Sequence, residues 1–208
     1  TNARGEEKRR EFRLKVLGVP GEGDKFLAIF DKPADVKGVA QLIISHKDKV
    51  DESWVYVPAL RRVKRISSQN KGGSFLGSEF INEDLIRGEA EKYKYKWLRD
   101  EVYEDEMCYV IERYPDLEYS NYSKWVSWID HSEFRVRKTE YYDKKGLLVK
   151  TIKSIGYKLY LDDFWFVDEY KIVNHQTGKS SSFLYEKYYF RTGLKDRDFS
   201  VNALKRMR

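Results

Sequence analysis

Apolar and polar residues alternate along most of this 208-residue chain. The clearest case is the run 92–97, Lys-Tyr-Lys-Tyr-Lys-Trp, where an extended strand places aromatic side chains on one face and lysines on the other. Other runs, such as 26–30 and 42–44, are apolar on both faces. Turn-forming residues separate the runs at 20–23, 143–146 and 174–178. The pattern predicts about ten to twelve strands, with hairpin loops at the last two turns.

Helical periodicity is rare. Residues 34–38 are a short candidate that ends in glycine, and residues 75–87 place two apolar pairs four positions apart, which predicts one or two amphipathic turns. Residues 199–208 are expected to form a final short helix or, from 200, a tail, and residues 1–5 to be a tag remnant or disordered.

The sequence predicts a mainly β fold with a few short helices. No internal repeat or linker divides the chain, so we expect a single domain over residues 1–208. One curved antiparallel sheet is the simplest arrangement of these strands. A curved sheet with too few helices to cover it must close, dimerise or leave a concave apolar surface, and such a surface is a ligand site.

Composition narrows the classes of partner. The net charge of +6 allows contact with nucleic acid or with anionic lipid headgroups, although 34 acidic residues are mixed among 40 basic ones. In the run 92–97 the lysines and aromatics lie on opposite faces, whereas single-stranded nucleic acid needs both on one face. A nucleic-acid-binding β-barrel is therefore disfavoured.

Candidate catalytic groups are scattered. The three histidines, His46, His131 and His175, are far apart and belong to no metal-binding motif. Cys108 is the single cysteine, which excludes an intramolecular disulfide and a thiolate zinc site; its alternation with Val110 predicts a buried thiol. We expect no catalytic residue, metal or cofactor. A hydrolase remains an alternative, because an acid pair such as Asp162-Asp163 is suited to acid–base work.

Residues 54–85 carry the most specific signal. A strand-like run ends at Pro58, a basic run follows, and a glycine-rich turn leads into an apolar segment closed by acids. This order resembles the LolA-like outer-membrane lipoprotein-sorting proteins, in the superfamily of LolA, LolB and LppX. The matching residues are Trp54, Tyr56, Pro58, Leu60, Arg62, Ile66, Ser74 to Ser78, Phe80, Glu83, Asp84 and Leu85. With the upstream run from Phe26, residues 26–88 carry the resemblance.

The resemblance implies an unclosed antiparallel half-barrel with a lid of short helices and loops over an apolar cavity. It also implies a periplasmic carrier that binds acyl chains of a lipoprotein or lipid and passes them toward the outer membrane. A resistance-nodulation-division (RND) type inner-membrane exporter is the partner that the resemblance suggests. The alternative is a non-catalytic interaction module of an exporter complex.

The expected location is the Gram-negative periplasm. The chain opens at Thr1 without a methionine, so we expect that an export signal peptide has been removed. No apolar run reaches the roughly 18–20 residues that span a bilayer, so membrane contact should be peripheral.

The resemblance also suggests site residues. Phe75, Leu76 and Phe80 are expected to contact the ligand from a flap whose neighbouring glycines permit movement, or else to fill the core. Trp54 and Tyr56 share one face of a strand, and they and Leu60 are cavity candidates or core residues.

The densest basic run contains Arg62, Lys64 and Arg65. We expect these side chains to be a solvated strand surface, or to bind a lipid headgroup or acids of the flap. The flap acids are Glu79, Glu83 and Asp84. Pairing between the basic run and these acids would form a latch, although exposed ion pairs contribute only about 0–1 kcal/mol each.

Overall fold

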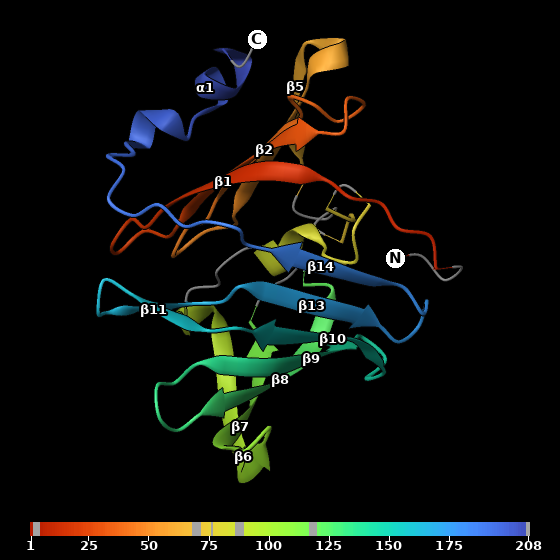
Figure 1. Cartoon of the computed structure of the whole chain (residues 1–208), viewed down its shortest axis with the longest axis vertical. Coiled ribbons are helices and arrows are strands. Elements are labelled where there is room, and N and C mark those ends of the chain that lie inside the picture. Colours follow the sequence, from red (N-terminus) through yellow and green to blue (C-terminus); the bar gives the residue numbers. More distant parts are fainter. Residues whose placement is uncertain (2–4, 68–71, 76, 86–89, 117–119, 207–208) are drawn as a thin grey trace. The chain divides into compact units, whose positions relative to one another are not determined.

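Antiparallel β-sheet dominates the computed structural model of the chain (Figure 1). The structure describes residues 1, 5–67, 72–75, 77–85, 90–116 and 120–206. Within these residues fourteen strands form sheets of five, seven and two strands, and none of the sheets closes into a barrel. The predicted mainly β, unclosed fold class is confirmed. The strands divide among separate sheets, where the alternation pattern had suggested a single one.

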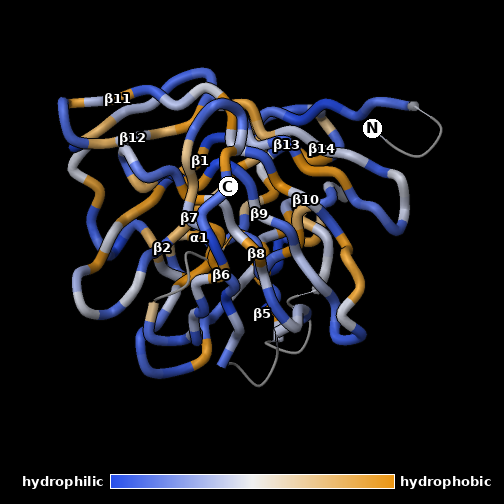
Figure 2. Tube along the Cα trace, turned by 90° about the horizontal axis from the view of Figure 1, so that it is seen from below, coloured by the Kyte–Doolittle hydropathy of each residue, from blue (hydrophilic) through white to orange (hydrophobic). Residues whose placement is uncertain are grey.

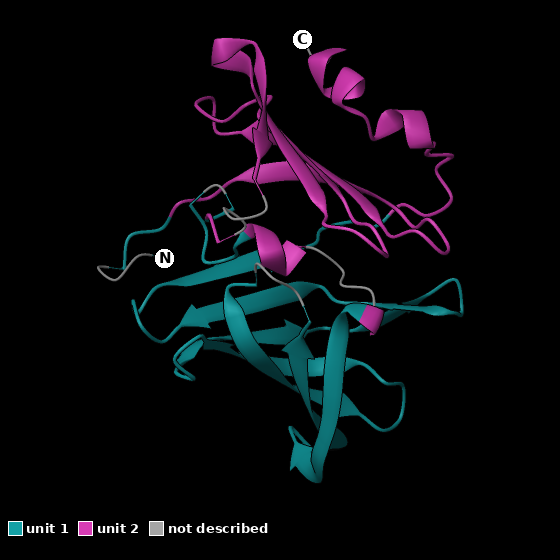
Figure 3. Cartoon of the chain, turned by 180° about the vertical axis from the view of Figure 1, so that it is seen from behind, with its two compact units in different colours: residues 1–7, 74–81, 92–188 teal, residues 8–73, 82–91, 189–208 magenta. Residues whose placement is uncertain are grey.

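The chain forms two compact units, which are coloured separately in Figure 3. The first, called the five-strand unit here, comprises residues 8–73, 82–91 and 189–208. The second, called the seven-strand unit, comprises residues 1–7, 74–81 and 92–188.

The strands of the five-strand unit follow one another in the sheet as they do in the chain. They are β1 (Glu11–Leu17), β2 (Lys25–Lys32), β3 (Ala40–Ile44), β4 (Glu52–Val57) and β5 (Arg62–Ile66). A 3₁₀ helix at Pro58–Leu60 connects β4 to β5 and ends at Arg61, whose φ of 47° is left-handed. Proline at the start of this turn presets its φ and ends β4 where the sequence predicts.

Residues 34–38 form a turn, not the short helix that the sequence suggested. Phe30 donates its backbone N–H to Val39 O (2.9 Å), and Gly38 N donates to Phe30 O (2.7 Å). These bonds extend the pairing of β2 toward β3, and the bonds inside the segment, Val36 N to Pro33 O (3.2 Å) and Lys37 N to Ala34 O (3.4 Å), are those of a turn. Gly38 has a φ of 78°, which favours glycine there.

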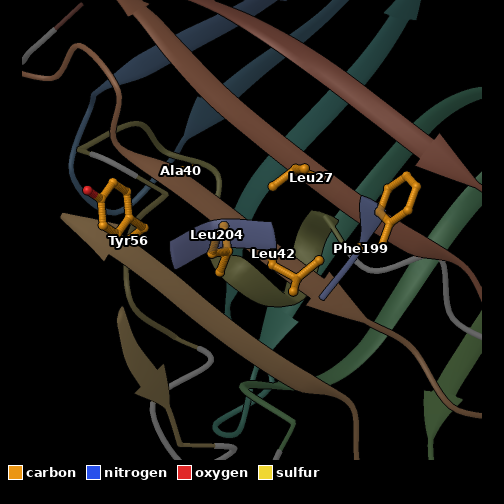
Figure 4. Close-up of a cluster of buried hydrophobic side chains, with 6 residues drawn as sticks. All are labelled: Leu27, Ala40, Leu42, Tyr56, Phe199 and Leu204. Atoms are coloured by element: carbon orange, nitrogen blue, oxygen red, sulfur yellow. The ribbon is translucent and has the colours of Figure 1, made fainter. Parts of the chain in front are cut away.

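One face of the five-strand sheet is covered by the C-terminal segment. Leu27, Leu42 and Trp54 are directly opposite one another on β2, β3 and β4, so they share this face. Figure 4 shows Leu204, on helix α1 (Val201–Arg206), and Phe199 beside these strands. Leu27, Leu42, Tyr56, Phe199 and Leu204 form one buried cluster, with Trp54 packed at its margin.

The seven-strand sheet has the order β14-β13-β10-β9-β8-β7-β6. Its strands are β6 (Tyr93–Tyr103), β7 (Glu106–Pro115), β8 (Tyr122–Asp130), β9 (Val136–Asp143), β10 (Leu148–Ile155), β13 (Glu169–Asn174) and β14 (Ser180–Leu184). A separate hairpin of β11 (Lys158–Tyr160) and β12 (Phe164–Phe166) lies in the chain between β10 and β13. The hairpin loops predicted at 143–146 and 174–178 are confirmed, as is a strand beginning in the run 92–97.

Figure 2 shows hydrophobic and hydrophilic stretches interleaved along the chain, as the alternation requires. Among the described residues, the remaining helical pieces are 3₁₀ turns at Asn82–Leu85, Ala90–Lys92 and Asp196–Asp198. Within the described residues, no helix combines the length and apolar character needed to cross a membrane.

Candidate functional site

Residues 74–81, called the flap loop here, fold back on themselves in the seven-strand unit. Ser74 pairs with Ile81 in an isolated antiparallel bridge, and Phe75 N donates to Phe80 O (2.7 Å). Ser78 Oγ donates to Phe75 O (2.8 Å), and Gly77 takes a φ of 80°, so both residues favour a tight reversal. The helical turns predicted over 75–87 are therefore absent from the described flap-loop residues, and the 3₁₀ turn begins only at Asn82. Leu76 lies outside the described residues.

The flap loop packs on the edge strand β14. The ring of Phe80 stacks on Phe183 with centroids 4.1 Å apart, and Phe75 meets the same ring edge-on at 5.7 Å. Glu79 N donates to Ser181 Oγ (3.0 Å), and Asn174 Nδ2 donates to Glu79 Oε2 (2.7 Å). Phe75 and Phe80 are both buried. Apolar stacking and two polar contacts thus hold the loop against one face of the sheet, called the flap face here.

The pairing register identifies which residues share the flap face, because residues directly opposite one another point to the same side. One row crosses the whole sheet from β14 to β6: Ser181, Ile172, Ile152, Thr139, Ser127, Ile111 and Trp97. Ile152 and Ile172 are buried, whereas Trp97 is 62% exposed. The row, called the apolar row here for its isoleucines, runs in register from β14, on which the flap loop packs, to the opposite edge at β6. The hydroxyls of Ser127 and Thr139, 3.0 Å apart, lie between Ile152 and Ile111.

A second row on the flap face is aromatic and basic: Asn174, Lys150, Tyr141, Trp125, Arg113 and Tyr95. Lys150 is a buried residue, 2% exposed, and its Nζ lies 5.0 Å from the ring centres of Tyr122 and Tyr141. Arg113 lies 4.6 Å from the rings of Tyr93 and Trp125. Cations held over aromatic faces are stabilised by the ring quadrupoles. The flap face therefore offers apolar surface beside fixed positive charge, which suits an amphiphilic ligand.

On the opposite face of the same sheet, a buried acid is paired with neighbouring side chains of the protein. Glu112 accepts hydrogen bonds from Lys124 and Tyr114. Burial raises the pKa of Glu112, but these hydrogen bonds outweigh it, and the pKa lies below its usual range. Burial and the adjacent Glu140 raise the pKa of Tyr142 to about 12. Cys108 is fully buried on this side beside Val110, as the sequence predicted, and burial raises the pKa of its thiol.

The structure places the other predicted cavity residues in the five-strand unit. Tyr56 is buried under the C-terminal segment and Trp54 lies at the margin of the same cluster. Leu60 is 56% exposed, in the 3₁₀ turn before β5. A ligand contact by these three residues stays a prediction.

The basic run lies along β5. Arg65 Nη2 donates to Glu52 Oε1 on β4 (2.7 Å), and its guanidinium lies 5.8 Å from the ring centre of Trp54. Arg62 and Lys64 are exposed on the same strand. The flap acids Glu83 and Asp84 are in the 3₁₀ turn Asn82–Leu85, and a latch between them and β5 stays a prediction.

A buried polar contact fixes the start of that 3₁₀ turn within the five-strand unit. Gln41 Nε2 donates to Asn82 Oδ1 (2.6 Å), and both residues are buried. Asn82 also donates its backbone N–H and its Nδ2 to Gly73 O (3.1 and 3.0 Å). Gly73 and Asn82 are the residues that immediately precede and follow the flap loop, so its two ends are held together at the base.

Two residues of the flap face were not predicted from the sequence. Phe183 is the surface on which the flap loop packs, but it lies about one hundred residues further along the chain, beyond any local pattern. Arg113 had a visible signal, because it occupies an apolar register after Tyr109 and Ile111. A cation on the apolar side of an alternating strand indicates either an internal partner or a ligand.

Within the described ranges, no three His, Cys, Asp or Glu side chains are arranged to hold a metal ion. His46 lies in the five-strand unit between two carboxylates, with Nδ1 2.6 Å from Glu22 Oε1 and Nε2 3.2 Å from Glu52 Oε2.

Known proteins resemble the chain over nearly its whole length. A model of a family described as "Uncharacterized protein" matches residues 22–206. The crystal structure of an outer-membrane lipoprotein-sorting protein domain from Vibrio parahaemolyticus is 48% identical, covers 95% of this chain and 84% of its own, and superposes with a TM-score of 0.93. A DUF1329 family protein from Desulfovibrio piger is 30% identical, covers 98% and 87%, and has a TM-score of 0.91.

A LolA superfamily protein from Nitrosomonas europaea shares the fold at 22% identity and a TM-score of 0.67, covering 92% of this chain and 82% of its own. A search of curated proteins found no match. The near full-length likeness at 48% identity agrees with the signal in residues 54–85. The chain therefore belongs to the LolA-like family of outer-membrane lipoprotein-sorting proteins.

Proposed function

We propose that this protein is a carrier that binds the acyl chains of a lipoprotein or lipid on the flap face of its seven-strand unit. The observation that carries the proposal is the packing of Phe75 and Phe80 on Phe183, on the same face of the sheet as the isoleucines of the apolar row. The likeness to a lipoprotein-sorting domain at 48% identity supports a lipid or lipoprotein ligand.

The physical basis is burial of hydrocarbon. An acyl chain gains about 0.8 kcal/mol for each CH₂ that it transfers from water to an apolar surface. Such binding needs no catalytic group, so the protein acts by binding and release. The apolar row provides Ile111, Ile152 and Ile172, and Trp97 extends it at the edge strand β6.

Release requires that the site open at low cost. The flap loop is held together by one isolated bridge and short-range hydrogen bonds, without the continuous ladder that a strand of the sheet has. A segment outside the regular ladder opens more readily than the sheet on which it rests, and opening here requires Phe75 and Phe80 to leave Phe183. In the proposed cycle, the flap loop leaves Phe183 when an acyl chain enters and returns when the chain is passed on.

The proposed setting is the Gram-negative periplasm, reached through an export signal peptide. The cargo moves toward the outer membrane, and an RND-type inner-membrane exporter is the proposed partner. Membrane contact is peripheral. Support for this setting comes from the lipoprotein-sorting relative and from the family resemblance of residues 26–88.

Native mass spectrometry of protein purified from a bacterial envelope tests the proposal. We expect a fraction of the protein to carry bound acyl lipid, which organic extraction releases. The variant Phe80→Asp should lose that lipid because it places a charge against the apolar face. The matched control is Leu184→Asp, since Leu184 adjoins Phe183 on β14, is exposed and points to the opposite face.

The control should keep its lipid. Protein that never carries lipid, or equal retention by both variants, would contradict the proposal. Unfolding of Phe80→Asp, monitored by circular dichroism, would show instead that Phe80 serves only to fill the core.

A further inference from the structure

We infer that Arg113 is the binding site for an anionic headgroup, a phosphate or a carboxylate, at the end of the acyl chain that the flap face carries. The inference rests on the proposed function and adds to it the chemical class of the ligand. It depends on three observations: the aromatic surroundings of Arg113, its unsatisfied hydrogen-bond donor, and the apolar residues next to it in register.

The guanidinium of Arg113 is held in a fixed place. It lies 4.6 Å from the ring centres of both Tyr93 and Trp125, whose rings are 5.3 Å apart and nearly perpendicular. Arginine stacks well on aromatic rings because its guanidinium is planar and weakly hydrated. Such stacking positions the charge, but the rings accept no strong hydrogen bond from its five N–H donors.

Arg113 has no acidic partner among the residues that the structure describes. Its Nε is buried and makes no hydrogen bond to any of them. The adjacent acid, Glu112, alternates to the opposite face and binds Lys124 there. Other arginines of the sheet have carboxylate partners: Arg99 donates to Glu101 (2.6 Å) and Arg135 to Asp130 (2.8 Å). Arg137, whose Nε is also unsatisfied, has Nη1 3.9 Å from Asp130 Oδ2. A buried, unsatisfied donor on a permanent cation is costly, and an anionic ligand would remove that cost.

The neighbourhood of Arg113 also fits a hydrocarbon tail. Tyr95 lies directly opposite Arg113 on β6, and Trp97 and Ile111 are the next pair in register on the same face. Tyr95 is 52% exposed, so the site is open to a ligand at the sheet edge. A single-chain amphiphile would place its headgroup on Arg113 and its chain along the apolar row.

Wild-type protein alone provides the first test. Binding of dodecyl phosphate, dodecanoate and dodecyl maltoside is measured by isothermal titration calorimetry, with inorganic phosphate as a headgroup without a chain. We expect both anionic probes to bind about 10- to 100-fold more tightly than the neutral maltoside, as a charge-assisted hydrogen bond contributes. The preference should decline as salt increases. Comparison of the two anionic probes shows whether the site favours phosphate or carboxylate.

Variants then locate the site. Arg113→Gln should abolish the preference for the anionic probes while leaving dodecyl maltoside binding unchanged, and Arg113→Lys should keep part of it. Arg99→Gln is the matched control, because Arg99 is a paired arginine that faces the other side of β6. The control should bind all probes like the wild type.

Two outcomes separate this inference from the proposed function. Equal binding of charged and neutral probes by the wild type would overturn the headgroup site and leave the carrier intact. Absence of binding by every dodecyl probe would overturn both. A preference that survives Arg113→Gln would also refute the assignment, by placing the anion elsewhere.

Discussion

Phe80 lies flat on Phe183, with ring centroids 4.1 Å apart and planes 17° from parallel. This contact joins a loop with little regular structure to an edge strand that follows it by about one hundred residues. Phe183 shares its face of β14 with Ser181, which is opposite the buried Ile172 at the end of the apolar row. The stability of the flap loop should therefore depend on the contact between Phe80 and Phe183.

A double-mutant cycle of Phe80→Ala and Phe183→Ala measures that dependence. Stacked aromatic pairs contribute about 0.5–1.5 kcal/mol beyond the area that they bury. We expect a coupling energy of that size in urea unfolding, together with faster amide exchange in residues 77–81 of both single variants. Strictly additive effects, with no change in exchange, would show that the flap loop is held by something else.

The contacts that hold the two ends of the flap loop together should depend on the side chain of Asn82. Its side chain accepts a hydrogen bond from the buried Gln41 and donates one to Gly73 O. Asn82→Ala removes the 2.6 Å acceptor of the buried Gln41 amide, which keeps a longer bond to Ser53 Oγ (3.4 Å), and we expect a loss of about 1–3 kcal/mol in the free energy of unfolding. Ser78→Ala, which affects only the tip of the flap loop, should cost less. An equal loss in the two variants, measured by chemical denaturation, would refute the assigned anchor.

The stability of the five-strand unit should depend on the packing of its C-terminal segment. Leu204 is buried against Leu42 and Tyr56, so Leu204→Ala should reduce stability by about 2–5 kcal/mol. Asn202→Ala, at an exposed position of the same helix, should change stability by less than about 0.5 kcal/mol. Thermal unfolding that responded equally to both substitutions would contradict the packing of α1 on this sheet.

The stability of the protein at low pH should depend on the charge of Asp130, which is fully buried in the seven-strand unit. Burial raises its pKa, but hydrogen bonds from Glu133 N (2.9 Å) and Arg135 Nε (2.8 Å) outweigh it and lower the pKa below the usual range. A lowered pKa contributes stability above the unfolded value of about 3.9, and this contribution is lost as pH falls through the folded pKa.

We therefore expect Asp130→Asn to lose about 3 kcal/mol at pH 7, because Arg135 is left without its buried partner. The difference from the wild type should shrink below about pH 4. Urea unfolding at a series of pH values measures it. A difference that stays constant down to pH 2 would show that the charge of Asp130 is not what stabilises this corner of the sheet.

Local chemistry was sufficient to predict much of the fold. Alternation identified the β-rich class, and the turns at 143–146 and 174–178 were recognisable because their residues favour reversal. Pro58 marked the end of β4. The same reasoning failed at residues 75–81, where an i, i+4 spacing suggested helix. Glycine and serine there favour a reversal, and the packing partner Phe183 is remote in sequence.

The candidate site was only partly predictable for the same reason. Phe75 and Phe80 were singled out by family resemblance, but the surface beneath them consists of residues from distant strands. Which face of each strand points toward the flap loop depends on pairing register. Bulges such as the one between Trp97 and Arg99 shift that register by one residue. Strict alternation cannot locate such a shift, so it could not assign Arg113 and Arg99 to opposite faces.

Photo-crosslinking with a diazirine-bearing fatty acid, mapped by peptide mass spectrometry, would locate a bound acyl chain on the protein. We expect label on the flap loop near Phe75 and Phe80 and on flap-face residues such as Ile111 and Trp97, with loss of label in Phe80→Asp but not in Leu184→Asp. Label confined to the opposite face of the sheet or to helix α1, or no label above that of an unrelated β protein, would contradict the proposed binding on the flap face.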